Sequence, residues 1–342
     1  MLNFSSTFML LCIFLLIASS SFGQKSPAET EFSFMFYNVE NLFDCVDDSL
    51  TNDDEFTPGG IRNWNTFKLY EKLDRLSKVI LAAGKWNQPV VVGLCEVENR
   101  NVLEMLIKNS ALKKSAYKII HKDSPDERGI DVAFLYRPDL FRPFDYQNIP
   151  VRDTLDSNFK TREILLVSGV FNGCDTLHFF VNHWPSRYGG IMETVGYRKL
   201  AAATLVKAIN RLHRQYSHPQ IVCMGDFNDQ PSDESLAVIT ETSDVNNRLI
   251  NLSAGWQKNE IKTLKNEYGW EVFDQWVVSN SFLEIHKCFR FMNAEIVKLP
   301  FLLEDDQKFG GLKPKRTYIG FKYQEGFSDH LPILIRLQML NY

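Results

Sequence analysis

Polar side chains that could do chemistry stand at the ends of apolar, strand-like runs of the sequence. The run Phe32–Tyr37 is followed at once by an asparagine and a glutamate, and the run Pro89–Cys95 is followed directly by a glutamate. The pattern recurs later in the chain, and its members are Asn38, Glu40, Asn41, Glu96, Asn182, His183, Arg187, Asp226, Asn228, Asp229, Asp329 and His330. Carboxylates, amides and imidazoles are therefore delivered repeatedly to strand ends.

Each of these groups has an ordinary explanation when it is taken alone. Asp226 and Asn228 could form an Asx turn, Glu96 could be a surface acid, and His183 could be a hydrogen-bonded core histidine. As a set they are harder to dismiss, because clustered acids repel one another unless a cation lies between them. Oxygen ligands suit Mg²⁺ or Mn²⁺, which leaves the histidines free for proton or phosphate chemistry.

The elements that must position these groups are strands separated by helices and polar loops. Residues Phe67–Ala83 and Tyr197–Tyr216 each place leucines and other apolar residues on one stripe, which predicts two amphipathic helices. Strand-like runs occur at Phe32–Tyr37, Pro89–Cys95, Asp131–Tyr136, Arg162–Phe171, Asp175–Asn182, Pro219–Gly225, Val272–Ser279 and Leu331–Leu337. Several runs are apolar throughout, which is typical of strands buried on both faces. The pattern predicts a layered α/β domain with two packed sheets and helices outside.

Composition is that of a globular protein with a substantial core. The 342 residues are 44% hydrophobic and 13% aromatic, and the formal net charge is −4. A chain of this charge is not a general polycation, so any contact with nucleic acid would need a local basic patch or bound metal. The sequence implies no stable protein partner, and we expect a monomer.

The first residues predict export rather than fold. Phe8–Ala18 is a short apolar run followed by small residues, which is typical of a signal peptide spanning residues 1–23 and cleaved before Gln24. The n-region carries no lysine or arginine, and the alternative is an uncleaved membrane anchor. We divide the rest into a short extension, 24–30, and one domain, 31–342. We expect the mature protein to be periplasmic or secreted.

Five cysteines remain after residue 23, namely Cys45, Cys95, Cys174, Cys223 and Cys288. The number is odd and there is no CxxC pair, so no zinc site is indicated. Cys95 and Cys223 lie in apolar runs and are expected to be buried. An exported chain could form one disulfide, and the sequence does not identify the pair.

The ordered motifs of the chain resemble the endonuclease/exonuclease/phosphatase superfamily, whose members include deoxyribonuclease I, abasic-site endonucleases, sphingomyelinases and inositol-polyphosphate phosphatases. The matching segments, in the family's order, are "NVENLF", "EVEN", "NHWPSR", "GDFND", "FDQWVVS" and "SDHLP". "GDFN" and "SDHLP" are specific when they occur together. The resemblance implies a four-layer α/β/β/α sandwich with two packed mixed β-sheets, and hydrolysis of a phosphate ester with a divalent metal.

The resemblance also implies roles for individual residues. The implied metal site contains Asn38, Glu40, Glu96 and Asp329, with Glu96 the principal ligand of Mg²⁺ or, alternatively, Mn²⁺. The implied catalytic residues are His183, Asp226, Asn228, Asp274 and His330. Asp274 would orient His330, while Asp226 and Asn228 would orient the attacking water and hold the phosphate. Whether Asp226 or His330 is the base stays open.

A basic rim is predicted around the site. Arg187 lies inside the His183 segment and is the clearest candidate for substrate contact. The further candidates are Arg128, Arg162, Arg198, Lys315 and Arg316. Asp131 could orient His183 or simply begin its strand. The segments "ERGIDVAFLYRP" and "KRTYIGFKYQEGFSDHLP" resemble an exported bacterial subgroup of the family, whereas "EIKTLKNEYGWEVF" lacks the Gly-Thr-Tyr turn expected before Asp274.

Three functions are compatible with the sequence. The first is an exported phosphodiesterase or endonuclease that cleaves nucleic acid by in-line attack of water. The alternative is a hydrolase of small phosphate esters or phospholipid head groups, for which Val297–Asp306 could be an apolar contact hairpin or, equally, core. The third, a non-catalytic binding module, is weakest because the implied catalytic and metal residues are present.

Overall fold

The computed structural model describes residues 31–340 except 86, 242–247 and 285. The chain divides into a unit of residues 1–30 and a unit of residues 31–342. The predicted signal peptide, 1–23, and extension, 24–30, therefore lie outside the described residues. Among the described residues, no helix is both long and apolar enough to cross a bilayer.

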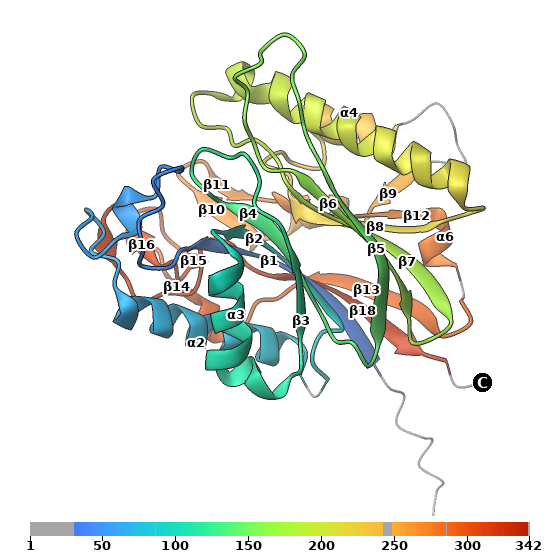
Figure 1. Ribbon diagram of the computed structural model, residues 1–342, viewed down its shortest axis with the longest axis horizontal. Helices are drawn as coiled ribbons and strands as arrows, with labels where there is room; N and C mark the ends of the chain where they lie inside the picture. Colours follow the sequence, from blue (N-terminus) through green and yellow to red (C-terminus); the bar gives the residue numbers. More distant parts are fainter. Residues whose placement is uncertain (1–30, 86, 242–247, 285, 341–342) are drawn as a thin grey trace, which may run out of the picture. The chain divides into compact units, whose positions relative to one another are not determined.

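Two six-stranded mixed sheets form the centre of the domain (Figure 1). The first, sheet A, has the order β13-β18-β1-β2-β4-β3 and contains β1 (Glu31–Leu42), β2 (Val91–Val97), β3 (Lys118–His121), β4 (Asp131–Tyr136), β13 (Phe289–Ile296) and β18 (Ile333–Met339). The second, sheet B, has the order β5-β6-β7-β8-β12-β9 and contains β5 (Phe141–Ile149), β6 (Ile164–Phe171), β7 (Asp175–His183), β8 (Gln220–Asp226), β9 (Leu249–Asn251) and β12 (Asp274–Ser279). The parallel pairs β1–β2 and β7–β8 lie at the middle of each sheet.

Helices cover the outer faces of the two sheets. Helices α2 (Thr66–Ala83) and α3 (Arg100–Asn109) lie against sheet A, and α4 (Ile191–Gln215) lies across sheet B (Figure 1). The remaining elements are α5 (Glu234–Thr240), α6 (Asn280–Leu283), the 3-10 turns Asp54–Phe56, Ala111–Lys114, Ala254–Lys258 and Pro300–Leu302, and the hairpins β10–β11 (Leu264–Asn266, Gly269–Glu271), β14–β15 (Leu303–Asp305, Leu312–Pro314) and β16–β17 (Tyr318–Ile319, Lys322–Tyr323). The predicted α/β/β/α layering is confirmed.

The core follows from the apolar runs. Aromatic rings of both sheets interlock between them, as where Phe34 of β1 meets Phe179 of β7 edge-on with ring centroids 5.0 Å apart. A separate cluster packs α4 against sheet B. Edge-on aromatic contacts of this kind add stability beyond the area they bury. Val297 and Leu302 are buried, so the core alternative holds for these two residues of the Val297–Asp306 segment.

Some boundaries differ from expectation. The second predicted helix begins at Ile191 rather than at Tyr197, because the helix takes in a first turn whose Ile191 and Met192 are exposed. Strand β5 was not predicted, since much of its length faces solvent with polar residues. Helix α3 is short and was also missed; Asn99 caps it by accepting a hydrogen bond from Val102 N.

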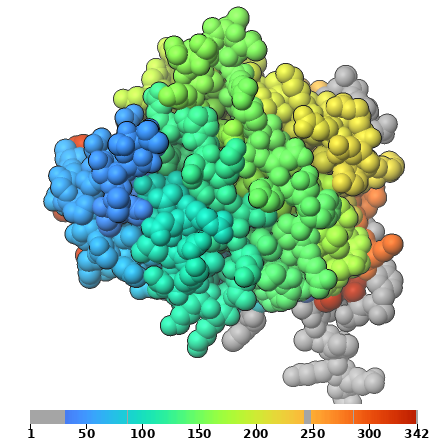
Figure 2. Space-filling view, viewed as in Figure 1, coloured from blue at the N-terminus to red at the C-terminus, as the bar shows by residue number. Residues whose placement is uncertain are grey.

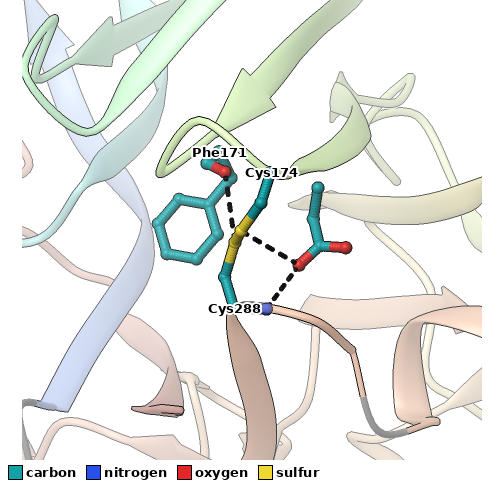
Figure 3. The surroundings of a disulfide bond; sticks show 4 residues. Phe171, Cys174 and Cys288 are labelled. Atoms are coloured by element: carbon teal, nitrogen blue, oxygen red, sulfur yellow. Dashed lines mark hydrogen bonds between the residues drawn. A yellow bond between two sulfur atoms is a disulfide. The ribbon is translucent and has the colours of Figure 1, made fainter. Parts of the chain in front are cut away.

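A disulfide between Cys174 and Cys288 joins the two sheets (Figure 3). Cys174 lies in the turn between β6 and β7 of sheet B, and Cys288 directly precedes β13 of sheet A. Asp175 supports the bridge, because its Oδ2 accepts a hydrogen bond from Cys288 N at 3.0 Å. Cys45, Cys95 and Cys223 are free thiols, and the last two are buried as predicted.

Candidate active site

The predicted catalytic and metal residues gather where the two sheets meet at one end. Strands β1 and β2 of sheet A bring Asn38 opposite Cys95, immediately before Glu96. In sheet B, His183 pairs with Asp226, and Asp226 also pairs with Asp274. Asp329 and His330 arrive on the loop that enters β18. Each sheet therefore supplies about half of the site.

A bulge at the end of β2 turns Glu96 into the site. Glu96 has a φ of +60°, and the register between β2 and β4 shifts between Cys95 and Val97. Bulges commonly re-aim one side chain out of the regular alternation of a strand. The Glu96 carboxylate accepts hydrogen bonds from Asn38 Nδ2 at 3.2 Å and from Asn41 N at 3.0 Å, both of them neutral donors.

Asn38 ties the acids of the two sheets together. Its Nδ2 also donates to Asp226 Oδ2 at 3.0 Å, while its Oδ1 accepts from Glu40 N at 3.0 Å. The amide therefore faces the site with its nitrogen. The sequence predicts Asn38 as a metal ligand; that role would require the amide to turn over, since the oxygen is turned toward Glu40 N.

His330 and Asp274 form a buried acid–histidine pair. His330 Nδ1 lies 2.7 Å from Asp274 Oδ2, and the backbone of His330 is held by Ser328 Oγ at 3.1 Å. Burial opposes a charge on the ring, but the carboxylates of Asp274, Asp226 and Asp329 outweigh it and hold the pKa of His330 well above its usual value. His330 is therefore protonated at neutral pH, with Nε2 free to donate.

Asp226 lies between the two histidines. Its Oδ2 is 3.7 Å from His330 Nε2 and 3.9 Å from His183 Nε2. Burial, followed by the nearby Arg162 and Arg128 charges, lowers the pKa of His183 well below its usual value, so His183 is neutral. Burial raises the pKa of Asp226, although the His330 charge opposes the rise. The three groups thus have distinct protonation states, as an acid–base site requires.

Asn228 and Arg187 build the loop beneath Asp226. Asn228 N donates to Asp226 Oδ1 at 2.9 Å, and Asn228 Nδ2 donates to Trp184 O at 2.9 Å. Arg187 Nε donates to Asn228 O at 2.8 Å, and its Nη2 lies 2.9 Å from Asp229. Further ion pairs join Arg187 to Asp233 at 2.5 Å and to Glu271 at 3.4 Å.

These contacts bear on the predicted substrate role of Arg187. With three carboxylates and one carbonyl as partners, the guanidinium braces the loop, and only 18% of its side chain is exposed. Arg128 is 49% exposed and faces Asp126 at 3.7 Å. Arg316 is 39% exposed and bridges Asp329 Oδ2 at 2.8 Å and Glu40 Oε1 at 3.3 Å. Arg128 and Arg316 thus keep exposed surface at the rim. The rim assignment is wrong for Arg162 and Arg198, which are buried and paired with Asp126 and Asp229, each at 2.8 Å.

Glu40 lies deeper than a solvent-facing ligand would. Thr317 N donates to its Oε2 at 2.6 Å, and Tyr318 N and Arg316 Nε approach its Oε1 at 3.4 and 3.3 Å. Burial raises the pKa of Glu40, and the charge of neighbouring Asp329 raises it further. Glu40 therefore anchors the 316–318 segment to the end of β1.

The surroundings of two residues, Lys72 and Asp131, differ from what the sequence suggests. Lys72 is fully buried on the stripe of α2 that also carries Leu69, Leu73 and Leu76, although an amphipathic helix usually keeps its lysines on the solvent face. The signal was available, since a lysine three residues after Leu69 falls on the apolar face. Asp131 does not orient His183: it accepts from Ser124 N at 2.8 Å and lies 3.2 Å from His121 Nε2.

The donor set fits a hard divalent cation. The carboxylate of Glu96 is 15% exposed, and its hydrogen-bond partners are neutral, with His183, itself neutral, as the nearest ring at 4.0 Å. Among the described residues, no cationic side chain donates a hydrogen bond to Glu96, and Asp329 has one oxygen that is not bound to Arg316. Oxygen donors of this kind suit Mg²⁺ or Mn²⁺. Asp226, Asp274 and His330 also bring three ligand-type atoms together. In this second group, His330 Nδ1 and Asp274 Oδ2 are already hydrogen-bonded to each other.

Solved structures with the same fold come from several organisms. An endonuclease/exonuclease/phosphatase family protein from Bacteroides thetaiotaomicron is 14% identical with a TM-score of 0.56, over 92% of this chain and 100% of that one. D. rerio TDP2 complexed with single strand DNA product is 13% identical with a TM-score of 0.56, over 90% and 99% of the two chains. The human Nocturnin catalytic domain with bound sulfate is 16% identical with a TM-score of 0.56, over 92% and 97%.

At these identities the structural likeness shows the fold alone. No curated protein matches the sequence. The sequence profile of the Endonuclease/Exonuclease/phosphatase family, however, matches residues 33–339, which is nearly the whole described domain. The chain belongs to the endonuclease/exonuclease/phosphatase family and is a hydrolase of phosphoric esters.

Proposed function

We propose that this protein is an exported, divalent-metal-dependent phosphodiesterase that cleaves nucleic-acid backbones. The observation that carries the proposal is the position of Asp226 between a protonated and a neutral imidazole, 3.7 Å from His330 Nε2 and 3.9 Å from His183 Nε2. An acceptor, a charged donor and a neutral ring within such reach are what attack of water on phosphorus needs.

In the proposed reaction, Asp226 accepts the proton of the attacking water. Because its pKa is raised, Asp226 is a stronger base than an exposed aspartate. Asn228 N and Asn38 Nδ2 donate hydrogen bonds to its two oxygens and hold them in place. The water oxygen bonds to phosphorus as the ester P–O bond on the opposite side breaks, and the leaving oxygen takes up a proton from solvent. His330, charged and held by Asp274, donates a hydrogen bond from Nε2 to the phosphate oxygens, on which negative charge grows. His183 donates a neutral hydrogen bond beside it. When bound at Glu96 and Asp329, Mg²⁺ or Mn²⁺ supplies further neutralisation of that charge.

Two observations support nucleic acid as the substrate: the DNA product bound to a protein of the same fold, and the exposed arginines at the rim of the site. The TDP2 structure holds a single strand DNA product. The sequence carries no base-reading motif, so contacts would be to the phosphate backbone. Arg128 and Arg316 could neutralise only a few phosphates, so binding should be weak and fall with added salt. Export is supported by the N-terminal pattern and by the Cys174–Cys288 disulfide, since disulfides persist in oxidising compartments.

One observation favours the second candidate, hydrolysis of small phosphate esters or phospholipid head groups. A cavity of about 540 Å³ lies beside the segment that follows β2, and the acids in its wall are Asp48, Glu98, Asp123, Asp126, Glu127 and Asp131. Lys160 is the one cationic side chain in that wall. An acidic wall repels an extended polyanion but tolerates a small substrate or one with a cationic group.

The test is a substrate panel with purified mature protein at low salt and with Mg²⁺ or Mn²⁺. Supercoiled plasmid, single-stranded DNA and RNA are compared with phospholipid and sugar-phosphate substrates, and the Glu96→Ala variant and a chelator serve as controls. We expect metal-dependent nicking that weakens as salt rises. Intact nucleic acid beside metal-dependent release of phosphate or a head group would reject the first function and support the second.

A further inference from the structure

Lys72 is a buried cation bound to Thr317, whose backbone N–H donates to Glu40, and to Phe327, which lies two residues before Asp329. It lies on α2, has no exposed surface, and donates from Nζ to Phe327 O at 2.7 Å and to Thr317 Oγ1. Both hydrogen-bond partners are neutral. A buried ammonium with neutral partners needs opposite charge nearby to offset its desolvation.

That opposite charge is supplied by the predicted metal acids. Burial lowers the pKa of Lys72 to about 8, while Glu40, Asp329 and Glu96 act in the opposite direction and Arg75 adds to the lowering. The ammonium is therefore largely protonated at neutral pH. Its two hydrogen bonds also fix the ends of the 317–327 segment, which delivers Arg316 and Asp329 on either side.

Arg316, which is partly exposed, is the second cation on this side of the site. It contacts Asp329 Oδ2 through Nη2 and Glu40 Oε1 through Nε. Glu40 Oε2 is taken by Thr317 N. Both oxygens of Glu40 and one oxygen of Asp329 are thus occupied by donors of the protein itself.

Glu96 is the contrasting acid. Asn38 and Asn41, its hydrogen-bond donors, carry no charge. Arg316 therefore contacts the acids of the Glu40 side directly, whereas Glu96 accepts hydrogen bonds only from neutral donors and meets the Lys72 and Arg316 charges at longer range.

We propose that Lys72 and Arg316 are built-in counter-ions that fill the Glu40 side of the site, so that the protein takes one divalent cation, at Glu96, with an affinity that Lys72 holds down. This inference rests on the proposed metal-dependent function and deepens it. Lys72 is a positioning residue, because it acts through Glu40, Asp329 and the 317–327 segment and not on substrate.

The experiment measures Mn²⁺ binding by electron paramagnetic resonance of the free ion, without substrate. Wild-type protein is expected to bind one Mn²⁺. Lys72→Met keeps the length of the side chain and removes its charge, so we expect binding about tenfold tighter, or a second bound ion, because a like charge near the site is gone. A purely structural role for Lys72 would loosen the site and weaken binding.

Lys68→Met is the matched control. Lys68 lies one turn earlier on α2, and its Nζ donates to the carbonyls of Arg62 and Asn63, away from the acids. Its Mn²⁺ affinity should equal that of wild type. Arg316→Met, on a half-exposed side chain, should shift binding in the same direction as Lys72→Met and carries the test if that variant does not fold.

The outcomes separate the inference from the function on which it rests. Two ions bound to wild type, or unchanged or weaker binding in both charge-removing variants, would overturn the role of Lys72 and Arg316 while leaving metal dependence intact. No Mn²⁺ bound to wild type would overturn both.

Discussion

Removing the disulfide should cost the domain much of its stability while leaving its chemistry nearly unchanged. The perturbation is the double variant Cys174→Ser, Cys288→Ser. The bridge closes a loop with a sequence separation of 114 residues, for which the chain-entropy relation gives a stabilisation of about 5 kcal/mol. Whole domains are stabilised by roughly 5–15 kcal/mol, so the bridge accounts for a large share.

The catalytic end is remote from this change. Strand β7 runs from Asp175 beside the bridge to His183 in the site, a span of about 26 Å at the usual rise per residue. The Asp175–Cys288 backbone hydrogen bond does not need the sulfur atoms and should persist. Turnover at a temperature at which both proteins are folded should therefore be close to that of wild type.

The assay is equilibrium urea unfolding followed by tryptophan fluorescence, with and without reductant. Reduction should lower the free energy of unfolding of wild type to about the value of the double variant. Reductant should leave the value of the double variant nearly unchanged. Cys45→Ser, which removes a free thiol, is the control and should respond to reductant as wild type does. A loss below about 1 kcal/mol would refute the reasoning, because it would mean that the sheets are held together without the cross-link.

Three further outcomes test the site and the core. Glu96→Ala should abolish metal-dependent turnover with an unchanged thermal midpoint in the metal-free protein, since it removes one acid from a cluster of acids and breaks no direct ion pair with a lysine or arginine; near-normal rates with Mg²⁺ would reject Glu96 as ligand. His330→Ala should lower turnover by a factor of about 10²–10⁴, and Asp274→Asn should lower it by less. Asp274→Asn should also shift the alkaline limb of the pH–rate profile to lower pH, because the carboxylate that raises the pKa of His330 is lost. Equal and negligible losses of turnover in both variants would remove His330 from the mechanism. Burial lowers the pKa of His178 to about 4, against about 6.5 in the unfolded chain, so stability should fall by up to about 3 kcal/mol as pH drops from 6.5 to 4. His178→Gln should flatten that dependence of the urea midpoint, and an unaltered slope would show that another group is responsible.

The fold class was predictable from the sequence because most of the central strands are apolar runs and the two main helices are amphipathic. The pairing and order of the strands were not predicted from the pattern, and several strand ends differ from expectation. The sheet strands that were missed, β3, β5, β9 and β13, are short or carry polar residues along much of their length.

The sequence predicted which residues form the site but not the hydrogen bonds and ion pairs between them. Motifs name Asn38 and Arg187, but they do not say that the Asn38 amide presents its nitrogen to two acids or that Arg187 is taken up by three carboxylates. Those facts depend on which partners the fold brings within 3–4 Å from distant segments. The pairing of Cys174 with Cys288 is of the same kind, since spacing alone left every pair open.

The division of the active site between the two sheets has a consequence for how activity is acquired. Glu96 and His330 come from sheet A, and His183, Asp226 and Asp274 from sheet B, so neither sheet alone holds both an acceptor and its charged donor. The His330–Asp274 hydrogen bond and the Asn38–Asp226 hydrogen bond both cross the interface. A newly made chain with only one sheet formed is thus chemically inert. During refolding, the rate at which hydrolysis returns therefore reports the docking of the two sheets and not the formation of either sheet.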